Sequence, residues 1–350
     1  MQPRPSSAAT QAPGATSGAA EPPGRLAILG LGQLGGSIAL GARAAGLVTE
    51  IVGFGRSEES LARARALGLA DRTTTDAREA VRGAATVVIS TPLRSVSAVA
   101  ARIRGALAPG ALVIDVGSVK ATAARDIEAH VLGAEGGGGG GGDGDGDGGG
   151  EGQEDQHPKS GTSVTSGPSS RAHEQAVSFV ACHPLAGTER FGPDAARADL
   201  YRGRRCIVCP SPRTAPAAIE RARRLWSALG AEVILMPAAL HDATMAAVSH
   251  LPHVAAFALA RALGDLPPDV AASALALPTT SLRDTTRIAA SSPEMWRDIL
   301  LENRAALLPL VSRFEDALAT LRAALAAGDA ASVEGFLGAA RDTRNHLFPE

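Results

Sequence analysis

The chain has 350 residues, a length that usually corresponds to about two domains. Its formal net charge is -2 at pH 7, so its charge gives no reason to expect binding to nucleic acid or to an anionic membrane. Three cysteines are too few for a disulfide framework. No apolar run approaches the length of a transmembrane helix, and residues 1–24 lack the apolar core of a secretory signal. We therefore expect a cytoplasmic protein, although an organelle transit peptide stays open.

Strand-like and helix-like segments alternate over the first part of the chain. Such alternation is typical of a parallel sheet built through right-handed crossovers, so we expect a Rossmann-type α/β domain over residues 25–211, after a disordered leader at 1–24. The expected strands are 25–30, 49–54, 86–90, 111–116, 178–182 and 204–209, and the expected helices include 34–46 and 57–67.

The second part of the chain has apolar periodicity near that of an α-helix, without a sheet of its own. We expect an all-α domain over residues 214–350, in which Pro252 kinks a long helix. Its apolar surface is more than one Rossmann domain can cover, so we expect a homodimer. The expected helices are 216–229, 238–263, 294–326 and 330–346.

A segment dominated by Gly, Asp and Ser interrupts the first domain at residues 134–175. Such a composition cannot bury enough apolar surface to offset chain entropy, so we expect a disordered loop. The loop contains a calcium-loop pattern, but its flanks are not helical, which favours an accidental match over an ion site. Weak ion binding stays open. The residues of the pattern are Asp143, Asp145, Asp147, Gly148 and Glu154.

A glycine turn follows the first strand directly. Gly30 permits the tight turn, Gly32 lets the backbone approach a pyrophosphate, and Gly35 lets the helix pack on the strand. Because the turn stands between a clear strand and a clear helix, the sequence predicts a dinucleotide site that also includes Gln33 and Leu34.

The end of the second strand bears on the choice between NAD and NADP. NAD sites usually place an acid there, whereas this chain has Gly55. Arg56 and Ser57 suit a 2′-phosphate, so we favour NADP. The alternative is that Arg56 is solvated and Ser57 caps the next helix.

Three further features lie near this predicted crevice. Thr91 and Pro92 follow the third strand and are expected to form a wall of the nicotinamide pocket. Lys120 follows the fourth strand and is either a base or the surface start of a helix. Cys206 and Cys209 have C-x-x-C spacing, but on a strand such side chains point to opposite faces, which favours structural cysteines.

A strand-like run over 178–182 is followed directly by His183, at the start of a predicted loop. The imidazole of histidine exchanges protons near neutral pH, so His183 is a candidate for acid–base chemistry. With this loop, the chain resembles the prephenate/arogenate dehydrogenase family of tyrosine biosynthesis over about residues 25–350, excluding the insertion. The resemblance is carried by the glycine turn and by the segments Asp115–Lys120, His183–Glu189, Ser249–His253 and Arg283–Ala289.

The resemblance implies an NAD(P)-dependent oxidative decarboxylation of prephenate or arogenate. It makes His183 the acceptor of a proton from the substrate's C4 hydroxyl, with Ser118 bridging the two, and Arg287 the ligand of a substrate carboxylate. The remaining substrate-side residues that it implies are Thr188, Glu189, His250, His253, Asp284 and Trp296.

These residues have plainer alternatives. His250 and His253 share a helix face, but without a clear third ligand a metal site is not expected. Glu189 and Asp284 could be a solvated charge pair, and Trp296 a core residue.

Other proteins join a Rossmann domain to a helical one. A β-hydroxyacid dehydrogenase needs a lysine in its second domain, and this chain has none after Lys159. An imine or pyrroline-carboxylate reductase, or a non-catalytic dinucleotide sensor, leaves His183 and Arg287 unexplained. Neither the choice between prephenate and arogenate nor inhibition by tyrosine follows from the sequence.

Overall fold

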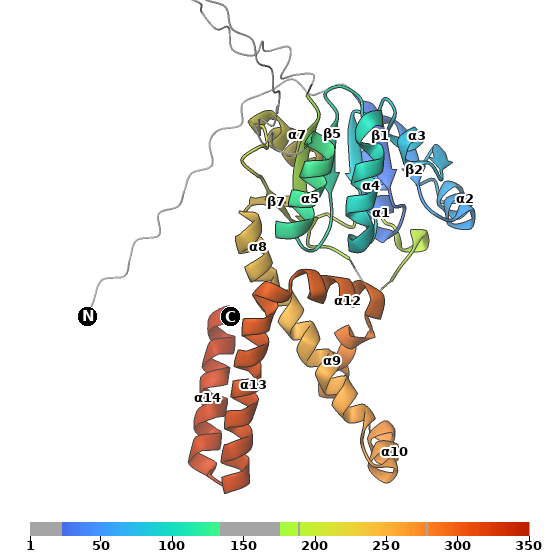
Figure 1. Ribbon diagram of the computed structural model, residues 1–350. Coiled ribbons are helices and arrows are strands. Elements are labelled where there is room, and N and C mark those ends of the chain that lie inside the picture. The colour runs from blue at the N-terminus through green and yellow to red at the C-terminus, as the bar shows by residue number, and fades with distance from the viewer. Residues whose placement is uncertain (1–22, 134–175, 188–189, 278, 350) are drawn as a thin grey trace, which may run out of the picture.

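The computed structural model describes residues 23–133, 176–187, 190–277 and 279–349. A sheet covered by helices forms one part, and a helical region hangs from one edge of it (Figure 1). The glycine-rich insertion at 134–175, with its calcium-loop pattern, lies outside the described residues, and so does the expected leader apart from residues 23 and 24.

One sheet of eight strands in the described residues has the order β3-β2-β1-β4-β5-β6-β7-β8. All neighbouring strands run parallel except β6 and β7, which are antiparallel. The expected parallel sheet is therefore correct as far as β6 and wrong at β7. The strands are β1 (Gly24–Leu29), β2 (Val48–Phe54), β3 (Arg72–Thr74), β4 (Thr86–Ile89), β5 (Leu112–Asp115), β6 (Ser178–Pro184), β7 (Arg205–Cys209) and β8 (Glu232–Leu235).

Two strands were not predicted from the sequence. β3 has only three residues and β8 only four, and both lie at edges of the sheet, where apolar alternation is weak. The expectation of an all-helical chain from residue 214 is wrong over β8, because the sheet continues to Leu235.

Alternation along the strands builds a core on both faces of the sheet. In β1, Leu26 and Ile28 pack on one side and Ala27 and Leu29 on the other, and all four are at most 2 % exposed. The helices in this part are α1 (Gln33–Ala44), α2 (Glu58–Ala66), α3 (Ala77–Val81), α4 (Leu93–Ile103), α5 (Ala121–Leu132) and α7 (Pro216–Ala228), with 3-10 turns η1 (Arg104–Ala106) and η2 (Pro193–Ala195).

The cysteines belong to this core. Cys206 and Cys209 pack on opposite faces of the sheet, as the strand periodicity predicted, and Cys182 joins Cys206. All three are free and buried. Burial raises the pKa of the Cys206 thiol, and it raises the pKa of Cys209 to about 12, so both stay as unreactive thiols at neutral pH.

The helical region begins directly after β8. α8, the π-helical turn η3 and α9 form one continuous helix, in which the π-turn ends at His250, just before Pro252; the kink expected at Pro252 stays a prediction. The elements are α8 (Ala238–Met245), η3 (Ala246–His250), α9 (Leu251–Gly264), α10 (Pro268–Ala276), α11 (Thr280–Thr286), the 3-10 turn η4 (Arg287–Ala290), α12 (Pro293–Glu302), α13 (Arg304–Ala327) and α14 (Ala330–Leu347). Helices α9 and α10 form one arm, and α13 and α14 form another (Figure 1).

The helix Ala238–Gly264 has 27 residues and a mean hydropathy of 1.3 over its most apolar stretch, of which 22 % is buried. By length and composition alone it is able to cross a membrane, so the expectation that no run approaches such a length is wrong. A single helix of this kind is weak evidence for a membrane. Its polar residues His241, Asp242 and His250 are buried inside the protein.

Candidate active site

The glycine turn between β1 and α1 fits a dinucleotide. Gly30 has φ +108°, and a Cβ there would overlap the carbonyl oxygen of Ser90, so only glycine suits this position. A Cβ at Gly35 would overlap the carbonyl oxygen of Gly30, whereas at Gly32 it would meet nothing within 4 Å. Gly32 also begins α1 without a capping side chain, which leaves backbone N–H groups for an anion.

The ribose end of this crevice follows β2. A Cβ at Gly55 would lie 2.9 Å from Cδ2 of Leu61, so the structure has little space for a side chain there. The Ser57 hydroxyl accepts a hydrogen bond from the N–H of Ser60 at 3.3 Å and caps α2. Arg56 is exposed. The capping interpretation of Ser57 is thus correct, and Arg56 remains the candidate for phosphate contact.

Thr91 lies between β4 and α4, next to the glycine turn. Its hydroxyl is buried and has no hydrogen-bond partner among the described residues. A buried polar atom usually has a partner, so an unsatisfied hydroxyl at this edge fits a bound ligand. Pro92 follows as the N-cap of α4. Together with the glycines, this hydroxyl makes the residues present compatible with a nicotinamide dinucleotide.

β6 brings His183 to the same edge of the sheet. The loop after it passes close to the start of α1, because a Cβ at Gly187 would lie 3.5 Å from Oε1 of Gln33. His183 is partly exposed, and its Nδ1 lies 2.8 Å from Nε2 of His241. Nδ1 of His241 lies 2.7 Å from Oδ1 of Asp242. A histidine–histidine–aspartate chain therefore runs from the sheet into α8.

Asp242 is held from the other side by the start of α5. Its two carboxylate oxygens accept hydrogen bonds from the N–H groups of Lys120 and Ala121, each at 2.8 Å. Burial raises the pKa of Asp242, but the hydrogen bonds from His241 and from these N–H groups outweigh it, and the net pKa is below the usual value. Asp242 is therefore an ionised carboxylate at neutral pH.

Lys120 is completely buried. Its ammonium group donates to the carboxylate of Asp115 and, at 2.8 Å, to the carbonyl oxygen of Cys182. Lys120 does start a helix, as the N-cap of α5, but at a buried position, so the surface interpretation is wrong; its role as a base stays a prediction. A buried lysine requires a partner, and Asp115 at the end of β5 supplies it.

The electrostatic environment of His183 keeps its imidazole neutral. Burial is the largest cause that lowers its pKa well below 6.5, and the positive charge of Lys120 lowers it further. The ring is thus a free base at neutral pH. In the described part of the chain, His183 makes no hydrogen bond with Ser118, whose loop follows β5, so the bridging role of Ser118 stays a prediction.

The two histidines that the resemblance placed on the substrate side, His250 and His253, both contact Trp296. His253 stacks on the indole with centroids 3.5 Å apart, and His250 meets its edge at 5.9 Å. Trp296 is 6 % exposed and packs with Val119 of the sheet domain, so it is a core residue at the junction of the domains. Its Nε1 is buried without a hydrogen-bond partner in the described residues, which leaves a donor for a ligand.

Both histidines present Nε2 to the site, but in different protonation states. Burial lowers the pKa of His250 to about 4, and burial followed by the charge of Arg287 lowers the pKa of His253, so both rings are neutral. Nδ1 of His250 lies 3.0 Å from the Asn303 amide nitrogen and accepts from it, which leaves Nε2–H as a donor. Nδ1 of His253 donates to the carbonyl of Ser249 at 2.9 Å, which leaves Nε2 as an acceptor.

Arg287 begins the turn η4, and Asp284 lies in α11. Both are exposed, and within the described residues they form no ion pair with each other. The charge of Arg287 nevertheless reaches the site, because it lowers the pKa of His253. Thr188 and Glu189 lie outside the described residues. No cluster of three His, Cys, Asp or Glu side chains that would hold a metal ion occurs in the described ranges.

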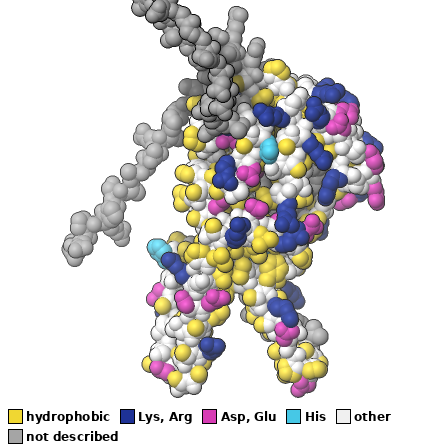
Figure 2. Space-filling model, in the orientation of Figure 1, with side chains coloured by type: hydrophobic (Ala, Val, Ile, Leu, Met, Phe, Trp, Pro, Cys, Tyr) yellow, Lys and Arg dark blue, Asp and Glu magenta, His cyan; other side chains and the backbone are white. Residues whose placement is uncertain are grey.

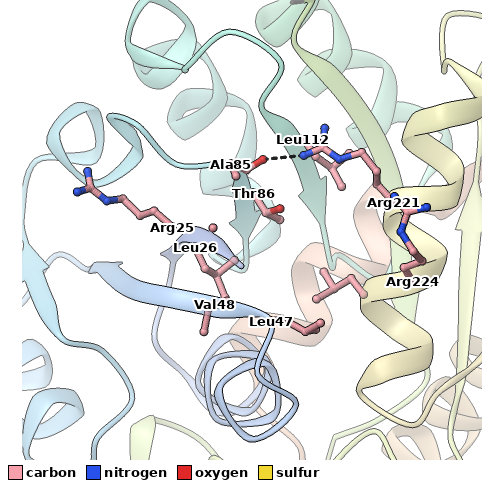
Figure 3. Close-up of a pocket in the computed structure, with 11 residues that line it drawn as sticks. Arg25, Leu26, Leu47, Val48, Ala85, Thr86, Leu112, Arg221 and Arg224 are labelled. Atoms are coloured by element: carbon pink, nitrogen blue, oxygen red, sulfur yellow. Dashed lines mark hydrogen bonds between the residues drawn. The ribbon is translucent and has the colours of Figure 1, made fainter. Parts of the chain in front are cut away.

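A separate pocket lies at the opposite, amino-terminal edge of the sheet (Figure 3). Arg25, Val48 and Thr86 at strand starts line it, and Arg221 of α7 spans it. Arg221 donates to the carbonyl oxygens of Gly110 at 2.8 Å and of Ala85 at 3.1 Å. The pocket is therefore tied together by structural contacts and is remote from His183, at the carboxyl edge.

Sequence reasoning missed His241, Asp242 and Asn303. Asn303 donates to the carbonyl oxygen of Asp242 at 2.8 Å as well as to His250. A possible signal was the adjacent pair of polar residues, His241 and Asp242, inside an otherwise apolar helix. A buried helix face rarely carries such a pair without partners.

Two family matches cover most of the chain. Residues 38–136 and 162–235 match the nucleotide-binding domain of prephenate dehydrogenase, and residues 237–338 match its dimerization domain. The chain belongs to the prephenate dehydrogenase family. The division between the two domains coincides with the end of β8, after which the chain enters α8.

Relatives of known activity agree with this family. The chain is 33 % identical over 304 residues to the cyclohexadienyl dehydrogenase of Zymomonas mobilis, covering 87 % of this chain and 89 % of that protein. It is 28 % identical over 324 residues to the prephenate dehydrogenase of Bacillus subtilis, covering 91 % and 75 %.

A solved structure has the same fold. The crystal structure of prephenate dehydrogenase from Aquifex aeolicus in complex with hydroxyphenyl propionate and NAD+ matches with a TM-score of 0.73 and 28 % identity, covering 93 % of this chain and 98 % of that one.

Proposed function

We propose that the protein oxidises and decarboxylates prephenate or arogenate with a nicotinamide dinucleotide, as a step of tyrosine biosynthesis. One observation carries the proposal: His183, a neutral imidazole, lies near the end of β6 at the carboxyl edge of the sheet, where the loop after it approaches the start of α1 and its Nδ1 contacts His241 of the helical domain. Membership of the prephenate dehydrogenase family supports it.

The chain's own residues supply acid–base chemistry and orientation. His183 accepts the proton of the C4 hydroxyl while the C4 hydrogen leaves as hydride, and loss of carbon dioxide then makes the ring aromatic. A bound nicotinamide supplies the hydride acceptor. Since a general base must be unprotonated, the low pKa of His183 keeps it active through the neutral range.

The opposite side of the site binds the substrate's acidic groups. Arg287 provides the positive charge for a carboxylate, and its planar fork suits bidentate contact. His250 offers Nε2–H as a neutral donor, whereas Nε2 of His253 accepts from a hydroxyl or amino group. Trp296 Nε1 is a further donor at the junction.

For the dinucleotide we propose NADP, used at least as well as NAD. The support is the lack of a carboxylate at Gly55, where Leu61 occupies the space, and the exposed Arg56 next to it. The Aquifex relative was solved with NAD+, so its ribose end is the natural comparison.

We further propose a homodimer formed through the helical domain, which matches a dimerization domain. Large apolar side chains lie exposed along both arms, among them Leu259, Leu277, Leu308 and Leu325. Figure 2 shows more apolar side chains gathered where the arms meet the sheet domain. A second copy of the chain would cover such surface.

The test is cofactor reduction followed by absorbance, with each substrate paired with each cofactor. His183→Asn is expected to lower kcat by about 100-fold or more, the usual contribution of a positioned acid–base group, with cofactor affinity kept. Arg287→Ala is expected to raise KM more than it lowers kcat, because it removes binding common to the ground and transition states. A folded His183→Asn protein with normal turnover would refute the role of His183.

A further inference from the structure

The chain of hydrogen bonds behind His183 fixes where the protons of both imidazoles lie. Asp242 is an ionised carboxylate, which only accepts, so the short contact to His241 requires a proton on Nδ1 of His241. A neutral His241 then has a lone pair on Nε2. Because Nε2 of His241 lies 2.8 Å from Nδ1 of His183, the proton of a neutral His183 lies on Nδ1.

This arrangement leaves Nε2 of His183 with a lone pair. The opposite arrangement would make Nε2 a donor, and it would be unable to take a proton from a hydroxyl. Which nitrogen is protonated is set by the hydrogen bond that the other makes. The state of His183 as a base is thus decided by side chains of α8, 58 residues along the chain.

We propose that His241 and Asp242 are positioning residues that hold His183 in the tautomer able to accept the substrate's proton, and that Asp242 stabilises the imidazolium that forms. The proposal rests on the proposed function, since it concerns the same proton transfer. It assigns to a His–His–Asp chain the task that a single aspartate performs toward the histidine of a Ser–His–Asp triad.

The other charged and titratable groups around His183 do not replace this chain. Lys120, beneath it, is paired with Asp115, and His250 is neutral and engaged by Asn303. Asp242 is therefore the carboxylate connected to His183 by hydrogen bonds in the described part of the site. His241 is itself 0 % exposed, so bulk water does not supply an alternative acceptor.

A purely structural role is the rival explanation. Asp242 also joins the two domains by accepting from the N–H groups of Lys120 and Ala121, so its substitution would disturb packing as well as catalysis. His241 is the better position to vary. His241→Gln keeps an acceptor near the place of Nε2, whereas His241→Leu removes it. The matched control is His130→Gln, a partly buried histidine on α5 that bonds Ser97 at 3.1 Å.

We expect His241→Leu to lower kcat by about 10- to 100-fold with KM within about threefold of wild type, a loss within the range of positioned acid–base groups. His241→Gln should recover most of that loss, and His130→Gln should behave as wild type. Equal kcat in the leucine and wild-type proteins would overturn the proposal, as would an equal loss in the leucine and glutamine variants.

A second measurement needs no variant at position 241. Nitrogen-15 NMR of histidine-labelled wild-type protein, with the His183 signals assigned by their loss in His183→Asn, should show Nδ1 protonated and Nε2 bare at neutral pH. Finding Nε2 protonated would overturn the proposal even if His241→Leu fails to fold. Inactivity of the wild type toward both substrates would instead refute the proposed function, and the NMR result would stand apart from it.

Discussion

Replacing Lys120 by methionine tests the buried ion pair beneath the site. Methionine is close to lysine in length and apolar, so it fills the space without the charge. The ammonium group of Lys120 is 0 % exposed and contacts Asp115, whose side chain is 1 % exposed. Lys120→Met leaves that carboxylate buried without its counter-charge, and it leaves the carbonyl of Cys182 without the 2.8 Å hydrogen bond.

The expected cost is large because the charge left behind cannot reach water. Removing one member of a buried pair typically costs about 3–5 kcal/mol, whereas replacing both members is often nearly neutral. Asp115 keeps hydrogen bonds from the N–H groups of Gly117 at 3.1 Å and Cys182 at 3.3 Å, which favours the lower end. We therefore expect Lys120→Met to lose about 3 kcal/mol of unfolding free energy, and Lys120→Met/Asp115→Asn to regain much of it.

Urea denaturation followed by tryptophan fluorescence measures the loss, since Trp226 lies buried in the sheet domain. Arg223→Met is the control: it breaks an exposed pair with Glu220 and should cost about 0–1 kcal/mol. The same Lys120→Met variant should move the acidic limb of kcat/KM to higher pH, because the Lys120 charge lowers the pKa of His183. A loss equal to that of the control would show that Lys120 is not the buried partner described above.

Three further outcomes are expected. Arg56→Ala should weaken the binding of NADP but not that of NAD, by about tenfold for each ~1.4 kcal/mol of lost contact energy. An equal loss of affinity for NAD would show that Arg56 does not contact the 2′-phosphate. Light scattering should return a dimer, and a fully active monomer would contradict the proposed assembly. The folded-state pKa of the site histidines lies below the unfolded value, so unfolding takes up protons and stability should fall as pH drops below about 6.5. His250 alone, with a pKa lowered from 6.5 to about 4, corresponds to about 3 kcal/mol, and a urea midpoint constant from pH 7 to 4 would refute this.

The sequence predicted those parts of the fold whose signal is local. The strand, glycine turn and helix over residues 25–46 combine apolar burial with a turn that only glycine permits, so the prediction needed no distant contact. β8 failed because an edge strand is half exposed and four residues carry little periodicity. β7 runs antiparallel to β6. The direction of a strand depends on the path of the connection before it, and the local apolar pattern of the strand does not indicate that path.

The sequence predicted those parts of the site in which the residue type alone indicates the chemistry. His183 and the glycines fall in this class. Lys120 was misread because its burial depends on Asp115 and on a carbonyl of another strand, and sequence spacing does not distinguish a buried lysine from a surface one. His241 was missed because its partner is 58 residues away in the sequence and its helix is mostly apolar.

The π-turn η3 explains how one helix places both His241 and His250 on the side that faces the site. Residues nine apart on a regular α-helix, such as His241 and His250, lie about 180° apart around its axis. A π-turn has more residues per turn, so each residue of η3 advances less around the axis and brings His250 back toward the side that carries His241 and Asp242. Asn303 contacts both the carbonyl of Asp242 and the ring of His250, which requires this change of register. On the same helix, Val248 is 64 % exposed, so it lies away from these buried polar residues.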